Sequence, residues 1–123
     1  MTQGVTSVAN GTIVKYQNIL TTQDVSNAIT WGNSYTAGDN PSGSLFAYGN
    51  VRHLRLQFTP KNAASGWVEI CTVGEGHRPA TYAYSICQAA GDQKTVRIGS
   101  DGKVEIYDKT ARAFSVSLTY LVP

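Results

Sequence analysis

The side chains that could take part in acid–base or nucleophilic chemistry are few and widely spaced. The histidines are His53 and His77, and Cys71 and Cys87 have no CxxC spacing. The acidic residues each stand apart: Asp24, Asp39, Glu69, Glu75, Asp92, Asp101, Glu105 and Asp108. No motif of a serine hydrolase, zinc protease, phosphate-binding loop or dinucleotide-binding turn is present. Because catalysis needs converging titratable groups, the sequence predicts a protein that is not an enzyme, with no cofactor.

The two cysteines allow two interpretations. Both thiols can be buried as small apolar side chains, or Cys71 and Cys87 can form a disulfide between neighbouring strands. A zinc site is not expected, because the chain offers too few ligands. We therefore predict no metal.

Binding is the remaining kind of chemistry, and aromatic and multivalent polar side chains are the groups that ligands usually contact. Trp31, Tyr35 and Asp39 lie in or beside the longest turn-forming stretch, and they are the least easily explained as core. His53 and Arg55 share one face of a predicted strand, where they can meet a ligand or a neighbouring subunit. These five residues are the candidate ligand-binding set.

The elements that must position these residues are predicted to be strands. No segment has the sustained apolar spacing of a long helix, whereas short runs rich in Val, Ile, Tyr, Phe and Thr alternate with Gly, Asn, Asp and Pro. The expected strands are 12–20, 28–31, 45–48, 51–58, 67–73, 82–88, 94–98, 103–107 and 113–122. About eight strands at this spacing predict an all-β, antiparallel fold: a sandwich, a jelly roll or a barrel.

Alternation within the strands predicts which side chains are buried. Leu54, Leu56 and Phe58 should be core, and Trp67 is interpreted as core because it opens an apolar strand. The stretch 32–43 should be an exposed loop. In the predicted hairpin 98–106, Asp101 and Gly102 are both expected to supply positive φ angles.

Length and charge limit the number of domains and the classes of partner that the chain can have. The chain has 123 residues, which predicts one domain spanning 1–123, with a polar 1–11 as a flexible or linker-like segment. Charged residues make up 15%, against about 25% in typical globular chains, and the formal net charge is only +2. A charge this small and scattered argues against nucleic acid as a partner. No apolar run approaches the length that a membrane span requires, so no membrane insertion is expected.

Three segments in the C-terminal part of the chain follow one another in a distinctive order. Segment 67–79, WVEICTVGEGHRP, is an apolar strand followed by a glycine–histidine–Arg-Pro turn, segment 98–106, IGSDGKVEI, is a hairpin, and 117–121, SLTYL, is the last strand. This order resembles the tip domains of bacteriophage tail fibres and baseplates, although their turn has a tyrosine in place of His77 and a proline before it. Arg78 and Pro79, like Asp101 and Gly102, are interpreted as structural turn residues.

The resemblance implies a jelly-roll-like β-sandwich head that forms a homotrimer and binds a bacterial cell-surface saccharide or other receptor. Its expected location is the virion, at a tail tip or baseplate assembled in the host cytoplasm, with other virion proteins as further partners. Two alternatives stay open: a structural connector or decoration protein of the virion, and a cellular lectin-like carbohydrate-binding module.

Overall fold

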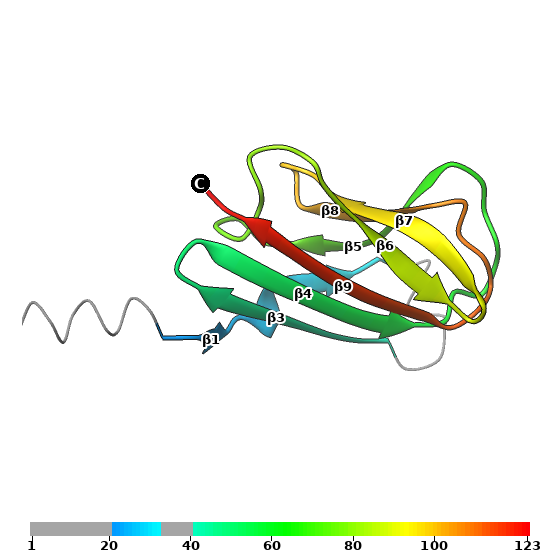
Figure 1. Ribbon diagram of the computed structural model, residues 1–123, viewed down its shortest axis with the longest axis horizontal. Helices are drawn as coiled ribbons and strands as arrows, with labels where there is room; N and C mark the ends of the chain where they lie inside the picture. Colours follow the sequence, from blue (N-terminus) through cyan, green and yellow to red (C-terminus); the bar gives the residue numbers. More distant parts are fainter. Residues whose placement is uncertain (1–20, 33–40) are drawn as a thin grey trace, which may run out of the picture.

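The computed structural model describes residues 21–32 and 41–123. The predicted strand 12–20, the segment 1–11 and the candidate residues Tyr35 and Asp39 lie outside this part of the chain. The prediction of an all-β, antiparallel fold is confirmed, with nine strands in one sheet (Figure 1). The strands are β1 (Gln23–Asp24), β2 (Ile29–Trp31), β3 (Ser42–Tyr48), β4 (Val51–Phe58), β5 (Trp67–Val73), β6 (Ala83–Ala89), β7 (Asp92–Ile98), β8 (Lys103–Tyr107) and β9 (Phe114–Leu121).

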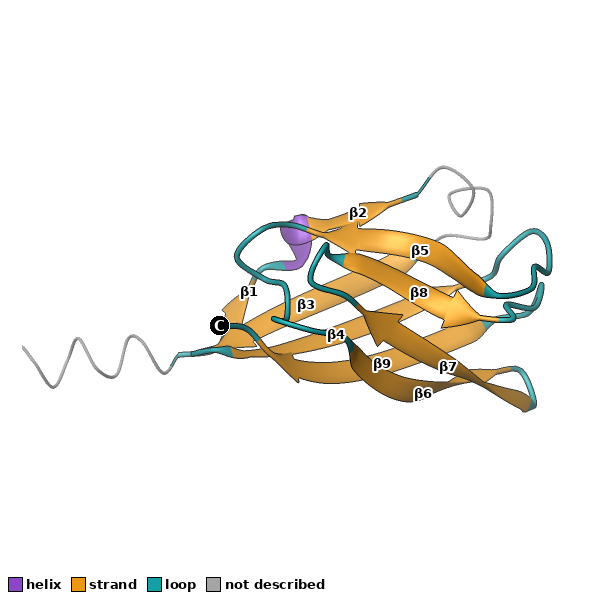
Figure 2. Cartoon of the chain, turned by 90° about the horizontal axis from the view of Figure 1, so that it is seen from above, coloured by secondary structure: helices purple, strands orange, loops and turns teal. Residues whose placement is uncertain are grey.

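The sheet is open but strongly curled, which brings its two edges near each other. Its strand order is β1-β3-β4-β9-β6-β7-β8-β5-β2, so β1 and β2 lie at opposite edges. In the sequence, however, only the short helix η1 (Ser26–Ala28) and Val25 separate these two strands. Such a short link requires the edges to lie close together, and Figure 2 shows β5 and β8 lying over β3 and β4. The result is a half-barrel with the two packed halves of a β-sandwich.

The core lies between the two halves. The predicted core positions Leu54, Leu56 and Phe58 are confirmed, with exposures of 0%, 1% and 4%. The largest buried side chains come from both halves: Leu45, Leu54 and Leu56, then Ile70, Val73, Val96, Ile98, Val104 and Ile106, then Val116 and Leu118. Strand β9 alternates buried and exposed residues along its whole length, as its sequence predicts. The part of the chain that the structure describes holds no helix long and apolar enough to cross a bilayer.

A β-bulge divides strand β5. The pairing with β8 shifts between Glu69 and Cys71, so that Ile70 and Cys71 are both fully buried although they are neighbours. Trp67 therefore lies on the opposite face from Cys71. The interpretation of Trp67 as a core residue is wrong: it is only half-buried, and its ring packs against Tyr84 and Tyr107 on the outer face.

The two predicted turn motifs contact each other. The carbonyl of Val73 accepts a hydrogen bond from Arg78 Nε at 2.7 Å, and the Val73 amide donates to the Gly102 carbonyl at 2.8 Å. Gly102 has a φ of 83°, whereas Asp101 has no positive φ, so the expectation for Asp101 is wrong. Its carboxylate instead accepts a hydrogen bond from the Lys103 amide at 3.0 Å, which holds the turn. Pro79 is buried next to Arg78.

Both cysteines are unpaired and buried, which excludes the disulfide alternative in this structure. Burial raises the pKa of Cys71 to about 12 and that of Cys87 to about 11. Because the thiolate is the reactive form, we expect neither thiol to react with Ellman's reagent in the native protein near neutral pH. Both should react once the chain is unfolded in urea. Rapid release of one equivalent from the native protein would contradict this burial.

Candidate functional site

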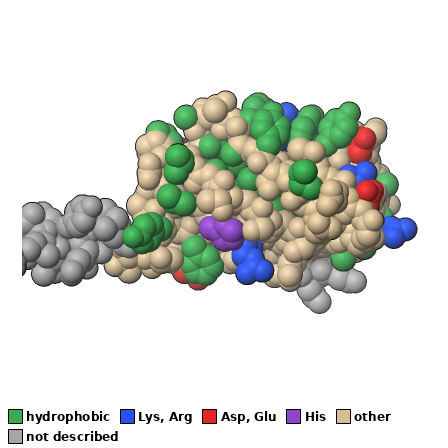
Figure 3. Space-filling view, in the orientation of Figure 1, with side chains coloured by type: hydrophobic (Ala, Val, Ile, Leu, Met, Phe, Trp, Pro, Cys, Tyr) green, Lys and Arg blue, Asp and Glu red, His purple; other side chains and the backbone are tan. Residues whose placement is uncertain are grey.

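Strand β6 points its large side chains away from the core. The inward positions hold the small residues Ala83, Ser85, Cys87 and Ala89, whereas Tyr84 and Ile86 point outward and are 56% and 64% exposed. An amphipathic strand normally buries its large apolar residues. The outer surface of β6 therefore has an apolar character that core packing does not explain, and Figure 3 shows hydrophobic side chains gathered there.

The neighbouring strands extend this surface. Tyr107 on β8 is 46% exposed, and Tyr82, just before β6, is 48% exposed. Trp67 on β5 lies beside Tyr107, with ring centroids 5.3 Å apart, and near Tyr84 at 6.2 Å. We call this surface the aromatic face. It consists of the four rings of Trp67, Tyr82, Tyr84 and Tyr107 and of the ion pair between Arg97 and Glu105.

An ion pair lies at the centre of the aromatic face. Arg97 Nε donates to Glu105 Oε1 at 2.9 Å, and both side chains are only 17% exposed. The guanidinium carbon lies 3.9 Å from the centroid of the Trp67 ring and 4.3 Å from that of Tyr82. Cation–π contacts of this kind contribute about 0.5–2 kcal/mol each and fix the rings in place. The aromatic face is therefore pre-formed.

The sheet register accounts for this arrangement. Glu105 is paired with Arg97 on β7, and Arg97 with Tyr84 on β6, so the three residues form one row across three strands. At one end of the face, Gly99 leaves room for Tyr82: a Cβ at Gly99 would lie 2.9 Å from Tyr82 Cε1. The ring of Tyr82 thus lies directly over the backbone of Gly99.

The sequence-predicted site residues lie elsewhere. Trp31 is half-buried and packs edge-on against Phe58, with centroids 5.7 Å apart, as part of the core margin. His53 and Arg55 lie on the outer face of β4, as their alternation predicts. His53 Nδ1 is 2.8 Å from Thr119 Oγ1 on β9. The structure does not bring these residues together with Trp31, because they are on opposite faces of the sheet.

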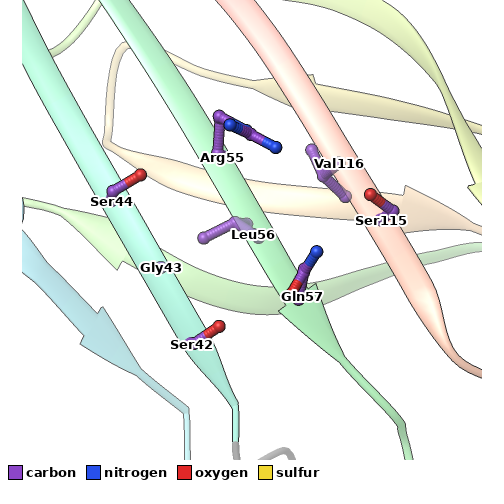
Figure 4. Close-up of a pocket in the computed structure, with 8 residues that line it drawn as sticks. All are labelled: Ser42, Gly43, Ser44, Arg55, Leu56, Gln57, Ser115 and Val116. Carbon is purple, nitrogen blue, oxygen red and sulfur yellow. The ribbon is translucent and has the colours of Figure 1, made fainter.

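Arg55 lines a hollow of about 330 Å³ on β3, β4 and β9, whose lining includes Leu56 and Val116 as well as polar side chains (Figure 4). Its other lining residues include Ser42, Ser44, Gln57 and Ser115. Serine and glutamine side chains can hydrogen-bond a ligand, but the hollow has no aromatic ring to stack on one. Because it has no aromatic ring, this hollow is a weaker candidate binding site than the aromatic face.

The second histidine is part of a buried arginine network. Arg52, only 8% exposed, donates from Nε to His77 Nδ1 at 2.9 Å and from Nη1 to the Gly49 carbonyl at 2.8 Å. The Tyr120 hydroxyl donates to the His77 carbonyl at 2.7 Å. Arg52 and His53 are neighbours on β4 that point to opposite faces, so His53 and His77 lie on different sides of the sheet. The two imidazoles do not converge.

This network predicts a pH dependence. Burial and the positive charge of Arg52 lower the pKa of His77 below its ordinary value of 6.5. A lowered pKa in the folded state means that the unfolded chain binds the proton more tightly, so stability should fall as the pH drops below about 6.5. Urea unfolding across this range measures it. In His77→Gln the loss between pH 6.5 and 5 should be smaller, because the carboxylates Asp24 and Asp92, whose pKa values are lowered from 3.8, titrate only at more acidic pH. An unchanged profile in the variant would contradict the assignment.

The described residues contain no group of three or more His, Cys, Asp or Glu side chains placed to hold a metal ion. No protein-family model matches the chain, and no curated protein matches it.

Proposed function

We propose that this chain is a non-catalytic binding domain that takes a cell-surface saccharide on its aromatic face. The observation that carries the proposal is the outward orientation of Tyr84 and Ile86 beside a pre-formed cluster of aromatic rings. Exposed aromatic residues held rigid by their neighbours contribute large contact area at low entropic cost. The separation of His53 and His77 by the sheet supports the non-catalytic part of the proposal.

We further propose that the domain is the receptor-binding tip of a phage tail or baseplate and acts as a homotrimer on the virion. This part rests on the resemblance of segments 67–79, 98–106 and 117–121 to such tips. Light scattering coupled to size exclusion tests it: a molar mass near three times 13.2 kDa is expected. A monomer would favour the lectin-like alternative, while a trimer that binds no cell would favour a structural virion component.

The saccharide part is tested with a pair of tyrosine variants. Tyr107, on the aromatic face, and Tyr48, on the other half of the sheet, are 46% and 47% exposed, so alanine removes a similar ring from a similar environment. With fluorescently labelled chain on a panel of intact bacteria, Tyr107→Ala should lower the affinity for a bound strain about tenfold, equivalent to about 1.4 kcal/mol. Tyr48→Ala should bind like the unchanged protein. Equal affinities for the two variants, or no labelling of any strain, would overturn the proposal.

A further inference from the structure

The charges on the aromatic face cancel. Four charged side chains point outward from its strands: Arg97 on β7, Lys103 and Glu105 on β8, and Glu69 on β5. They sum to zero, and the only cation among the rings, Arg97, already has Glu105 as its partner at 2.9 Å. A face built to attract an anionic ligand would leave such a cation uncompensated.

The cation is also in close contact with two aromatic rings. Arg97 lies over the rings of Trp67 and Tyr82, at 3.9 and 4.3 Å, and keeps only 17% of its side chain exposed. A carboxylate or sulfate group of a ligand would approach a guanidinium whose charge Glu105 already compensates, and it would also meet the negative charge of Glu105 itself.

What the face offers in place of charge are ring surfaces and hydroxyl groups. The rings of Tyr82, Tyr84 and Tyr107 are about half exposed, and a phenolic hydroxyl both donates and accepts hydrogen bonds. Sugar hydroxyls also both donate and accept hydrogen bonds. The C–H faces of a pyranose ring are apolar and can pack against an aromatic ring. A ligand with many hydroxyls and no charge fits every group on this surface.

We infer that the aromatic face selects neutral saccharides and discriminates against anionic ones, and that the Arg97–Glu105 ion pair is the specificity device. The inference rests on the proposed saccharide-binding function and adds the chemical class of the ligand. Arg97 acts as a positioning residue for the rings, and Glu105 keeps its charge from attracting anions.

Isothermal titration with defined oligosaccharides tests this. The probes are neutral hexasaccharides (from cellulose, chitin and mannan) and anionic oligosaccharides of similar length (from polygalacturonate and hyaluronan). The unchanged chain should bind at least one neutral probe, with an affinity insensitive to salt, and should bind every anionic probe at least about tenfold more weakly.

The variant Glu105→Gln sharpens the test. Glutamine keeps an acceptor for Arg97 Nε but removes the compensating charge, so the affinity for the anionic probes should rise about tenfold relative to the affinity for the neutral probes and should become sensitive to salt. Glu75→Gln, in the exposed connection after β5, makes the same change in net charge away from the face and should leave both classes unaffected.

The outcomes separate the two levels of the argument. A preference of the unchanged chain for anionic probes, or an equal effect of Glu75→Gln and Glu105→Gln, would overturn the inference and leave saccharide binding standing. No binding to any probe, or a change in molar mass on Tyr107→Ala that marks the face as a contact between copies, would overturn both.

Discussion

Replacing Gly102 with alanine is expected to destabilise the fold by about 3 kcal/mol or more. A Cβ at this position would lie 2.3 Å from the Val73 carbonyl oxygen and 2.5 Å from Arg78 Nε. The φ of 83° adds strain for any residue with a side chain. Because the two turns meet at Val73, the substitution would separate them. Urea unfolding followed by tryptophan fluorescence measures the loss.

Gly49→Ala is the matched control. Gly49 also has a positive φ, 58°, but nothing lies within 4 Å of the Cβ that alanine would add. Gly49→Ala should lower the free energy of unfolding only by the backbone strain, about 1 kcal/mol. The difference between the two variants measures the steric clash of the added Cβ with the Val73 carbonyl and the Arg78 side chain, and equal losses would contradict the close packing of the two turns.

Replacing Trp67 with alanine is expected to weaken saccharide binding about 30-fold or more, equivalent to about 2 kcal/mol. The indole ring contacts Tyr84, Tyr107 and the guanidinium of Arg97, so its removal takes away contact area and releases its neighbours. The loss of stability should be smaller, about 1 kcal/mol, because the ring lies outside the core. Titration with the best neutral hexasaccharide, alongside urea unfolding, gives both quantities.

Trp31→Ala should behave in the opposite way. Its ring packs against Phe58 at the edge of the core, so alanine should cost about 2–3 kcal/mol of stability and leave binding nearly unchanged. The two tryptophan variants therefore decide between the site predicted from sequence and the aromatic face. If Trp31→Ala loses binding and Trp67→Ala does not, the ligand binds beside Trp31.

The fold class was predictable because alternation is a local signal. The strand predictions 51–58, 67–73 and 103–107 agree with β4, β5 and β8 in their full extent. Strand order was not predictable. The adjacency of β4 and β9, about sixty residues apart, depends on long-range pairing that the pattern of one strand does not specify.

The site was harder to predict, and the reasons lie in two strands. In β6 the alternation of Tyr82, Tyr84 and Ile86 with small residues is clear in the sequence, but a period of two does not say which set is buried. The rule that large apolar residues are buried favours the wrong face, because the inward set here consists of the small residues Ala83, Ser85 and Ala89.

In β5 the bulge broke the pattern. Trp67 and Cys71 are four positions apart, which places them on the same face of a regular strand, and the extra residue at Ile70 reverses that relation. Arg97 was missed for another reason. A single arginine on a predicted strand does not indicate a binding site until the aromatic rings that contact it are known.

The bulge also has a consequence for how relatives of this chain must be compared. Strand β5 consists of two segments of opposite phase joined at Ile70: the segment with Trp67 presents its odd-numbered residues to the outer face, and the segment with Cys71 and Val73 presents them to the interior. A descendant that lost the bulge would keep Trp67 outside and Cys71 inside only by deleting one residue between these segments. An alignment without a gap there would equate a surface residue in one protein with a core residue in the other.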